Sequence, residues 1–305
     1  MENKILVTGG TGLIGSCFQD ERFIRTPSRE AINLLDRDSV SGLMSGIRPE
    51  GVIHLAAKVG GVKGNMTYPA DFTYQNLMMN TIVIEESRLA GVKRLVFFAS
   101  TCVFPDKIEY PLTPDKIHQG PPHKSNYGYA YAKRMADVQI QAYREQYGVN
   151  YFSVIPCNVY GPNDCYNMEN GHVIPSLIHK FYLAKERGED VTIWGSGAPL
   201  REFMFSRDIA KLTELLYDNY NGGEAVILSS GQEVSIKSVV EMIADIFEFK
   251  GKIIFDTSKP EGQFRKPSDN SVIKTMFPDF KFTPMEEGLR ESIEWFVENY
   301  PNVRL

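Results

Sequence analysis

The chain has 305 residues, of which 43% are hydrophobic and 23% are charged, and this ordinary globular composition predicts one large domain and a smaller one. The formal net charge of −5 at pH 7 argues against nucleic acid or an anionic membrane as the main partner, because such surfaces usually require a concentrated basic patch. A small anionic ligand is compatible with this charge.

The N-terminal stretch MENKILVTGG lacks the layout of a signal peptide, and no apolar run reaches the ~18 residues of a membrane span, so we expect a cytoplasmic protein. Strand-like apolar runs follow along the chain (KILVTG, GVIHLAA, KRLVFFAS and YFSVIPC), and helical patterns near residues 72 to 90 and 127 to 147 separate the later ones. This alternation is typical of βαβ units on a parallel sheet with helices on both faces.

We therefore predict an α/β fold with two parts. Residues 1–165 are expected to form a Rossmann-type, doubly wound parallel sheet, to which the chain returns near residues 200–230. Residues 166–305 are expected to form mainly a smaller C-terminal α/β lobe that binds the substrate. The four cysteines, Cys17, Cys102, Cys157 and Cys165, lack the spacing of a zinc site, so we expect neither a metal nor disulfides.

The first strand runs directly into TGGTGLIG, which places Gly9, Gly12 and Gly15 at a strand-to-helix turn. Glycines there let the backbone approach a pyrophosphate, and the start of the helix supplies N–H groups. A simple tight turn is the alternative. The position after an N-terminal strand favours a dinucleotide-binding loop.

The next segment, RFIRTPSRE, offers Arg25, Ser28 and Arg29 where the ribose 2′ position of a dinucleotide would lie. Basic side chains accept a 2′-phosphate, so the segment favours NADP over NAD, and residues 1–165 are expected to bind NADP. The alternative is that both arginines are merely solvated. Asp36 is expected near the adenine rather than on the ribose.

In YGYAYAK, only Tyr129 stands four residues before Lys133, on the same face of the predicted helix. A nearby ammonium, together with an oxidised nicotinamide, should lower the phenol pKa from its ordinary ~10 and make Tyr129 a usable acid. The alternative is a packed helix with a snorkelling lysine. A second pair, Ser100 and Cys102 in FFASTCVFPD, would share one face if the strand continued through them.

Together these motifs resemble the extended short-chain dehydrogenase/reductase family, and more narrowly its epimerase-reductases that act on GDP-4-keto-6-deoxy-D-mannose. The resemblance covers almost the full length, through HLAAKVGG, STCVFPDK, GPPHKSNYGYAYAKRM, PCNVYGPND, GHVIPSLIHK, WGSGAPLREF and DTSKPEGQFRK.

The resemblance implies five catalytic residues. Cys102 would act as the base and His172 as the acid in the inversion of C3 and C5, because hydrogens on carbons beside a ketone are acidic. Ser100 would hydrogen-bond the C4 carbonyl oxygen, Tyr129 would protonate it, and Lys133 would hold the nicotinamide ribose. The alternatives are an inert buried cysteine at Cys102 and a helix cap or packing group at His172.

The resemblance also implies binding residues. For the cofactor these are Gly9, Gly12, Leu13, Ile14, Gly15, Leu55, Ala56, Ala57, Tyr129, Lys133, Pro156, Asn158, Val159 and His172. For the substrate they are Ser100, Asn158, Lys180, Trp194, Arg201 and Lys266. Arg201 is the strongest diphosphate candidate because a planar guanidinium suits phosphate oxygens, whereas Trp194 could equally belong to the core.

The expected protein is an NADPH-dependent epimerase-reductase that converts GDP-4-keto-6-deoxy-D-mannose to GDP-L-fucose. Two alternatives are a 4-ketoreductase of another GDP-4-keto sugar, a dideoxyhexose or a heptose, and a regulatory NADP-binding protein without catalysis. We also expect a homodimer, because the helices near residues 72 to 90 and 127 to 147 carry apolar residues beyond one core-facing stripe, and relatives pair through such helices.

Overall fold

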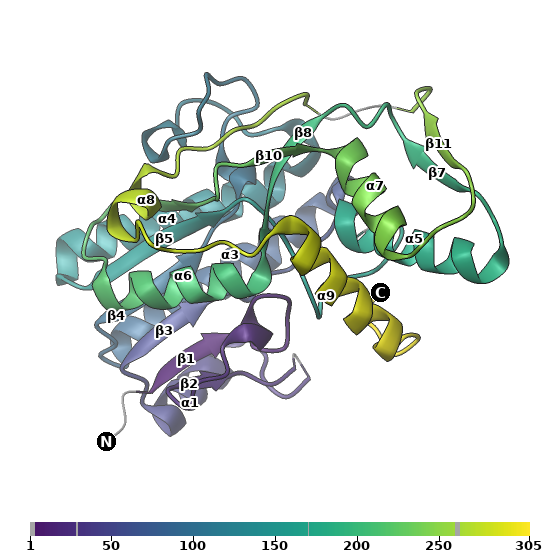
Figure 1. Cartoon of the computed structure of the whole chain (residues 1–305). Coiled ribbons are helices and arrows are strands. Elements are labelled where there is room, and N and C mark those ends of the chain that lie inside the picture. Colours follow the sequence, from purple (N-terminus) through teal and green to yellow (C-terminus); the bar gives the residue numbers. More distant parts are fainter. Residues whose placement is uncertain (1–3, 29, 170, 260–262) are drawn as a thin grey trace.

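A sheet of six parallel strands organises the first part of the chain in this computed structural model, which describes residues 4–28, 30–169, 171–259 and 263–305 (Figure 1). Its strand order is β2-β1-β3-β4-β5-β9. The strands are β1 (Ile5–Thr8), β2 (Phe23–Arg25), β3 (Gly51–His54), β4 (Arg94–Phe98), β5 (Asn150–Pro156) and β9 (Val226–Leu228). The predicted doubly wound parallel sheet is confirmed.

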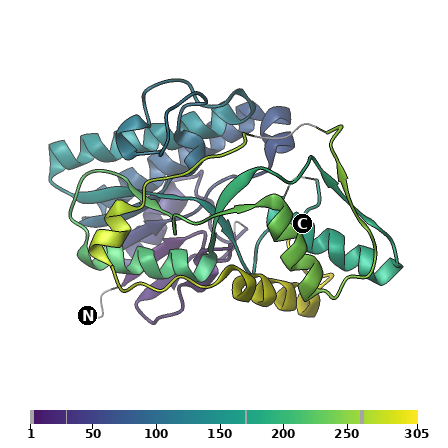
Figure 2. The same cartoon turned by 45° about the horizontal axis from the view of Figure 1, so that its top comes forward.

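Helices cover both faces of this sheet because its strands are apolar on both sides. Leu6 of β1 packs into one core, whereas its neighbours Ile5 and Val7 pack into the other. The helices that contribute to the first core are α1 (Arg37–Ile47), α3 (Pro69–Leu89) and α4 (Tyr127–Tyr147), and those of the second are α6 (Ser206–Asn219) and α8 (Ser271–Met276). Figure 2 shows the sheet between α3 and α4 on one side and α6 on the other.

The helix expected after the glycine loop is only a single 3-10 turn, Gly15–Cys17. The chain must already re-enter the sheet at Phe23, and the buried Phe18 packs edge-on against Phe23 with ring centroids 5.0 Å apart. A ligand at this loop would therefore meet the backbone of the loop itself and not the N-terminus of a long helix with its dipole.

The second part of the chain builds a separate core around Phe181, Phe247 and Phe296. Two small sheets flank it, with strand orders β10-β8-β6 and β11-β7. Their strands are β6 (Asn158–Tyr160), β7 (Val191–Trp194), β8 (Leu200–Phe205), β10 (Glu233–Ser235) and β11 (Ile253–Asp256), and the helices are α5 (Val173–Arg187), α7 (Ile236–Ile246) and α9 (Met285–Asn299). Short elements elsewhere are α2 (Val62–Thr67) and the 3-10 turns Thr101–Val103, Pro114–Lys116 and Lys124–Asn126.

The chain crosses between the two parts more than once. After β8 in the smaller part, α6 and β9 pack onto the six-stranded sheet, and β10 then returns to β8. The division at residue 165 stays a prediction, since each part contains segments from both sides of that position.

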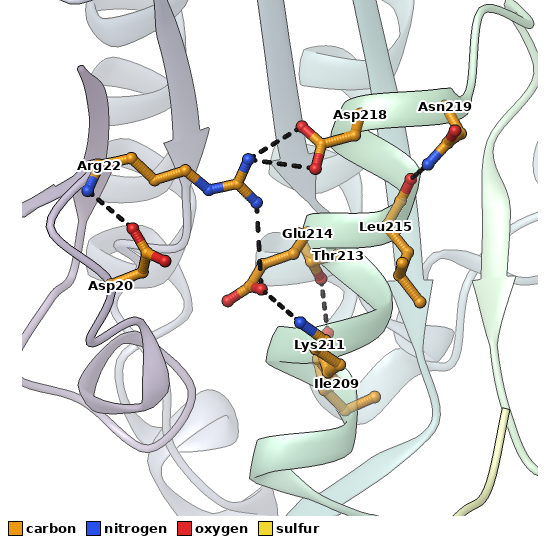
Figure 3. A network of polar contacts seen from close by, with 9 residues as sticks. All are labelled: Asp20, Arg22, Ile209, Lys211, Thr213, Glu214, Leu215, Asp218 and Asn219. Carbon is orange, nitrogen blue, oxygen red and sulfur yellow. Dashed lines mark hydrogen bonds and ion pairs between the residues drawn. The ribbon is translucent and has the colours of Figure 1, made fainter. Parts of the chain in front are cut away.

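A charged network fastens the edge of the sheet to α6 (Figure 3). One guanidinium nitrogen of Arg22 donates to both carboxylate oxygens of Asp218, at 3.0 and 3.1 Å, and Arg22 also lies 4.0 Å from Glu214. Lys211 contacts the same glutamate at 3.2 Å.

In the described part of the chain, none of the helices combines the length and apolar character that a membrane crossing requires.

Candidate active site

The glycine loop lies at the carboxyl ends of β1 and β3, where the strand order of the sheet reverses. In doubly wound sheets this is the place where ligands bind. Gly9 has φ +71°, and a Cβ on it would lie 2.9 Å from the backbone nitrogen of Ala56. A Cβ on Gly15 would lie 2.2 Å from the carbonyl oxygen of Gly9, whereas one on Gly12 would meet only that oxygen, at 3.4 Å. The backbone of the loop therefore packs tightly at Gly9 and Gly15 and leaves open space beside Gly12, which fits a pyrophosphate.

A buried polar chain holds the loop after β3 in place. The backbone N–H of Ala56 donates to the Thr8 hydroxyl oxygen at 3.2 Å, and that hydroxyl donates to Nδ1 of His54 at 2.7 Å. The other ring nitrogen of His54 donates to Asn80 Oδ1 at 3.1 Å. Burial lowers the pKa of His54 to about 3, so its ring is neutral. Sequence reasoning gave no role to this histidine of HLAA.

Arg25 lies at the end of β2 beside the glycine loop. Its guanidinium is exposed and donates to the carbonyl oxygen of Ser16 at 3.3 Å, and a Cβ on Gly10 would lie 2.5 Å from Cβ of Arg25. Ser28 is exposed nearby in the sequence, whereas Arg29 lies outside the described residues. The fourth expected contact, Asp36, accepts a hydrogen bond from the backbone N–H of Asp38 at 3.1 Å and so caps α1.

Ser100 and Cys102 meet in a turn rather than along a strand. β4 ends at Phe98, and Ser100 caps the following 3-10 turn by accepting a hydrogen bond from the backbone N–H of Cys102 at 3.3 Å. The expectation that the two share a strand face was wrong. The local hydroxyl-to-backbone turn brings them together instead, as serine side chains often do at such caps.

Tyr129 and Lys133 lie one turn apart on α4, beside the end of β4. Nζ of Lys133 donates to the carbonyl oxygen of Phe98 at 2.7 Å and lies 5.8 Å from the Tyr129 ring centroid. Lys133 is only 1% exposed, and burial lowers its pKa to about 7. Burial, with a smaller contribution from Cys102, raises the pKa of Tyr129. The expectation that Lys133 lowers this phenol pKa included the charge of an oxidised nicotinamide, so it stays a prediction; in the protein alone, burial has the largest effect on the phenol pKa.

His172 stands directly before α5, and its side chain makes no capping hydrogen bond there, so the capping alternative is wrong. Its ring is 56% exposed, and Nδ1 lies 3.9 Å from Oδ1 of the buried Asp164. This carboxylate raises the pKa of His172. Within the described residues, no hydrogen bond or ion pair joins His172 to Ser100 or Cys102.

Two of the predicted diphosphate cations lie on neighbouring segments. Nζ of Lys266 donates to the carbonyl oxygen of Thr101 at 2.8 Å, next to the Ser100–Cys102 turn. Arg201 lies half-buried on β8, and burial lowers the pKa of both cations. The buried carboxylate of Glu202 accepts hydrogen bonds from the backbone and hydroxyl of Ser268 and so joins the two segments. Sequence reasoning missed this contact.

Trp194 lies at the surface on β7, not in the core. Its side chain is 66% exposed, so the core alternative is wrong. Nζ of Lys180 lies 5.9 Å and Nζ of Lys259 5.8 Å from the Trp194 ring. An exposed aromatic ring between two cations can stack a base while the cations attract phosphate.

The other predicted cofactor contacts follow the strands of the large sheet. Leu13 and Ile14 lie in the loop after β1, Leu55, Ala56 and Ala57 follow β3, and Pro156, Asn158 and Val159 lie at or after the end of β5. All of them therefore gather at the carboxyl edge of parallel strands. Asn158 is exposed, and its amide donates to the carbonyl oxygen of Glu202 at 2.8 Å.

Comparison with known proteins agrees with this geometry. The NAD dependent epimerase/dehydratase family matches residues 5–228. A GDP-L-fucose synthase from Dictyostelium discoideum is 44% identical over 315 residues, which cover 99% of this chain and 98% of that protein. A crystal structure of a GDP-L-fucose synthetase from Naegleria fowleri bound to NADP superposes with a TM-score of 0.94 at 41% identity, covering 100% of this chain and 96% of the other. More distant is a GDP-6-OMe-4-keto-L-xylo-heptose reductase from C. jejuni, with a TM-score of 0.88 at 26% identity over 98% of both chains.

Proposed function

Because the chain belongs to the NAD-dependent epimerase/dehydratase family, we propose that it is an NADPH-dependent epimerase-reductase that converts GDP-4-keto-6-deoxy-D-mannose to GDP-L-fucose. The near full-length similarity to GDP-L-fucose synthases supports this function. The observation that carries it is the turn in which the backbone N–H of Cys102 donates to Ser100 Oγ, with Cys102 close enough to Tyr129 to raise the pKa of its phenol. A plain ketoreductase needs no such thiol.

The cofactor site fits NADP. The tightly packed backbone of the glycine loop leaves open space beside Gly12 for the pyrophosphate. The exposed guanidinium of Arg25 is near enough to the loop to bind a 2′-phosphate. When bound, NADPH supplies the hydride that reduces C4. Lys133 would hold the nicotinamide ribose.

In the reduction, Tyr129 and Ser100 act on the C4 oxygen. Burial keeps the Tyr129 phenol protonated, so it holds a proton to donate as negative charge develops on that oxygen. The Ser100 hydroxyl donates a hydrogen bond to the same oxygen, and this bond strengthens as the charge grows.

In the epimerisation, Cys102 removes the acidic proton beside the ketone and His172 returns one from the opposite face. Both side chains are accessible enough for this, since Cys102 is half-buried and His172 is exposed. Asp164 raises the pKa of His172, which favours the acid form of the imidazole. Ser100 stabilises the enolate oxygen between the two steps.

The nucleotide end of the substrate would lie on the smaller part of the chain. Arg201, Lys266 and Lys180 are the cations that would contact the diphosphate, and the exposed ring of Trp194 would stack on the guanine. Asn158 would contact the sugar or the nicotinamide.

A homodimer through α3 and α4 also belongs to the proposal. Large apolar side chains stay exposed on these two helices: Tyr74, Met78 and Leu89 on α3, and Tyr127, Tyr131, Met135 and Val138 on α4. Their helical spacing supports burial against a second copy in a four-helix bundle. Glutamate at both Met135 and Val138 should give a monomeric mass by light scattering, whereas Val297→Glu on α9 should not. A monomeric wild type would refute the dimer. A cytoplasmic location rests on the sequence alone.

The function is tested with GDP-4-keto-6-deoxy-D-mannose in D₂O, followed by NMR with and without NADPH. The wild type should exchange the hydrogens at C3 and C5 and, with NADPH, form GDP-L-fucose. Tyr129→Phe should suppress reduction but keep exchange, whereas Cys102→Ser should abolish exchange and keep NADPH binding. Cys165→Ser is the matched control and should behave as wild type. Full epimerisation by Cys102→Ser would refute the role of the thiol.

A 4-ketoreductase of another GDP-4-keto sugar is the second candidate, and the similarity to the heptose reductase structure favours it. The same experiment separates the two. Reduction by the wild type without exchange at either carbon would support the plain reductase, and a panel of GDP-4-keto sugars would then identify the substrate.

A further inference from the structure

We propose that Asp164 is a positioning residue for His172, which orients the imidazole so that Nδ1–H faces the carboxylate and Nε2 faces the sugar. The inference rests on the proposed function, in which His172 delivers a proton during epimerisation. It goes further by naming the group that decides which ring nitrogen carries that proton.

Asp164 is a buried hydrogen-bond acceptor with one carboxylate oxygen unused. Its side chain is only 4% exposed, and Oδ1 accepts a hydrogen bond from the backbone N–H of Cys165 at 2.7 Å. The other oxygen, Oδ2, is buried and has no hydrogen-bond partner among the described residues. An unpaired buried carboxylate oxygen is costly, and such groups in native proteins call for an explanation. His172 is the neighbouring group with a ring N–H to offer this carboxylate, and its Nδ1 lies 3.9 Å from Oδ1.

The loop between β6 and α5 is built to hold the two residues together. Asn163 takes a left-handed conformation with φ 63°, which turns the chain directly before Asp164. At the other end, a Cβ on Gly171 would lie 2.4 Å from the carbonyl oxygen of Asn167, so the loop closes tightly before His172. The hydroxyl of Ser176 on α5 donates to the same carbonyl at 3.0 Å. The aspartate therefore lies in a tightly closed loop, and the imidazole beside it is exposed.

A modest rotation of the ring brings Nδ1 within hydrogen-bond distance of the carboxylate, and such contacts often tighten only when substrate binds. With Nδ1–H held by Asp164, the second ring nitrogen is the one that loses and regains the catalytic proton. Among the described residues, Asp164 and Arg304 are the charged groups that act on His172; the carboxylate raises the pKa of the imidazole, burial and the guanidinium lower it, and Asp164 has the largest effect.

The first experiment needs no substitution and no substrate. The ¹⁵N chemical shifts of the histidines, with His172 assigned from the spectrum of His172→Gln, report its tautomer and pKa. We expect the neutral ring to carry its proton on Nδ1. A neutral ring protonated on Nε2 would overturn the proposal, and this readout does not depend on the substrate being correctly identified.

The second experiment compares Asp164→Asn with Asp208→Asn, a matched control in which another buried carboxylate, bonded to Thr283, lies outside the proposed catalytic machinery. Asp164→Asn should lower the pKa of His172, move the basic limb of the epimerisation pH profile to lower pH, and slow inversion about tenfold. Proton removal by Cys102 and C4 reduction should stay close to wild type. Asp208→Asn should leave the His172 pKa unchanged.

A double-mutant cycle completes the test. In the His172→Gln background, Asp164→Asn should have no further effect on inversion, because its only route to the reaction is lost. If Asp164→Asn slowed inversion equally in the wild-type and His172→Gln backgrounds, or slowed exchange and reduction equally, Asp164 would have only a structural role. If the wild type forms no GDP-L-fucose, the proposed function fails, while the tautomer and the pKa still decide whether Asp164 orients His172.

Discussion

Replacement of the buried Lys133 by methionine should stabilise the protein in a way that depends on pH. An ordinary lysine has a pKa of ~10.4, whereas burial lowers that of Lys133 to about 7. Between these two values the unfolded chain binds a proton that the folded chain does not, so this lysine makes folding more favourable as the pH rises. At pH 7 the cost is about 4 kcal/mol, since each pKa unit corresponds to ~1.4 kcal/mol.

Methionine fills a similar volume without the charge, but it leaves the carbonyl oxygen of Phe98 without its donor. That loss costs about 1–3 kcal/mol at any pH, so the absolute gain is smaller than the burial term alone. The pH dependence is the diagnostic quantity. Urea unfolding of cofactor-free wild type and Lys133→Met at pH 7 and pH 9 should show the difference in unfolding free energy changing by about 2 kcal/mol in favour of the wild type.

Lys185 offers a matched control, because its ammonium also donates to a phenylalanine carbonyl, that of Phe247 at 2.8 Å, while its side chain is exposed. Lys185→Met removes the same kind of donor from an exposed side chain and is measured alongside as the control for the lost hydrogen bond. A pH-independent difference for Lys133→Met would refute the argument that burial suppresses the charge of Lys133. Reduction should be lost in Lys133→Met, so the site retains this lysine at the expense of stability.

Four further changes follow from contacts in the site and at the sheet edge. Arg25→Ala should lower the NADPH/NADH ratio of kcat/KM about tenfold, because the Arg25 guanidinium lies beside the glycine loop, where it would bind a 2′-phosphate. Gly15→Ala should weaken NADPH binding at least about tenfold by calorimetry, because its Cβ would lie 2.2 Å from the carbonyl oxygen of Gly9. Trp194→Ala should raise KM for the GDP-sugar about tenfold with little change in kcat, through the loss of stacking. Arg22→Ala should cost about 1 kcal/mol in urea unfolding at low salt and less at 1 M salt.

Each of these expectations has an outcome that contradicts it. An unchanged cofactor ratio would move 2′-phosphate recognition away from Arg25. Gly42 on α1 has open space where a Cβ would lie, so Gly42→Ala is the control for Gly15→Ala, and equal NADPH affinity in the two variants would show that the loop can relax. A fall in kcat alone would place Trp194 outside nucleotide binding, and a salt-independent cost for Arg22→Ala would mean that packing on Phe23 outweighs the ion pairs.

The large sheet could be predicted well because each of its strands is recognisable from its own run of apolar residues. Buried parallel strands are apolar on both faces, and the glycine loop and the Tyr129–Lys133 spacing follow local rules of backbone and helix geometry. The single 3-10 turn after Gly15 agrees with the few residues that the sequence leaves before RFIRT, because its length is decided by where β2 must start.

The electrostatics of the site could not be read from the sequence. The pKa of Tyr129 depends on how deeply the ring is buried and on the nearby Cys102, and neither is a property of the motif. The contact between Asp164 and His172 likewise depends on a loop conformation fixed by Asn163 and Gly171. A polar pair eight positions apart has no periodic signature, so only the folded loop brings it to attention.

The placement of β9 at the end of the large sheet has a consequence for synthesis on the ribosome. Residues 226–228 pair with Val154–Pro156 of β5, so the first sheet keeps an unpaired apolar edge until the chain has grown past them. Exposed edges of this kind recruit other strands, which makes the nascent chain prone to aggregation. A fragment that stops near residue 165 would carry the same open edge permanently, together with Tyr129 and Lys133 but without Arg201 and Lys266. Expression of such a fragment alone should therefore yield insoluble protein.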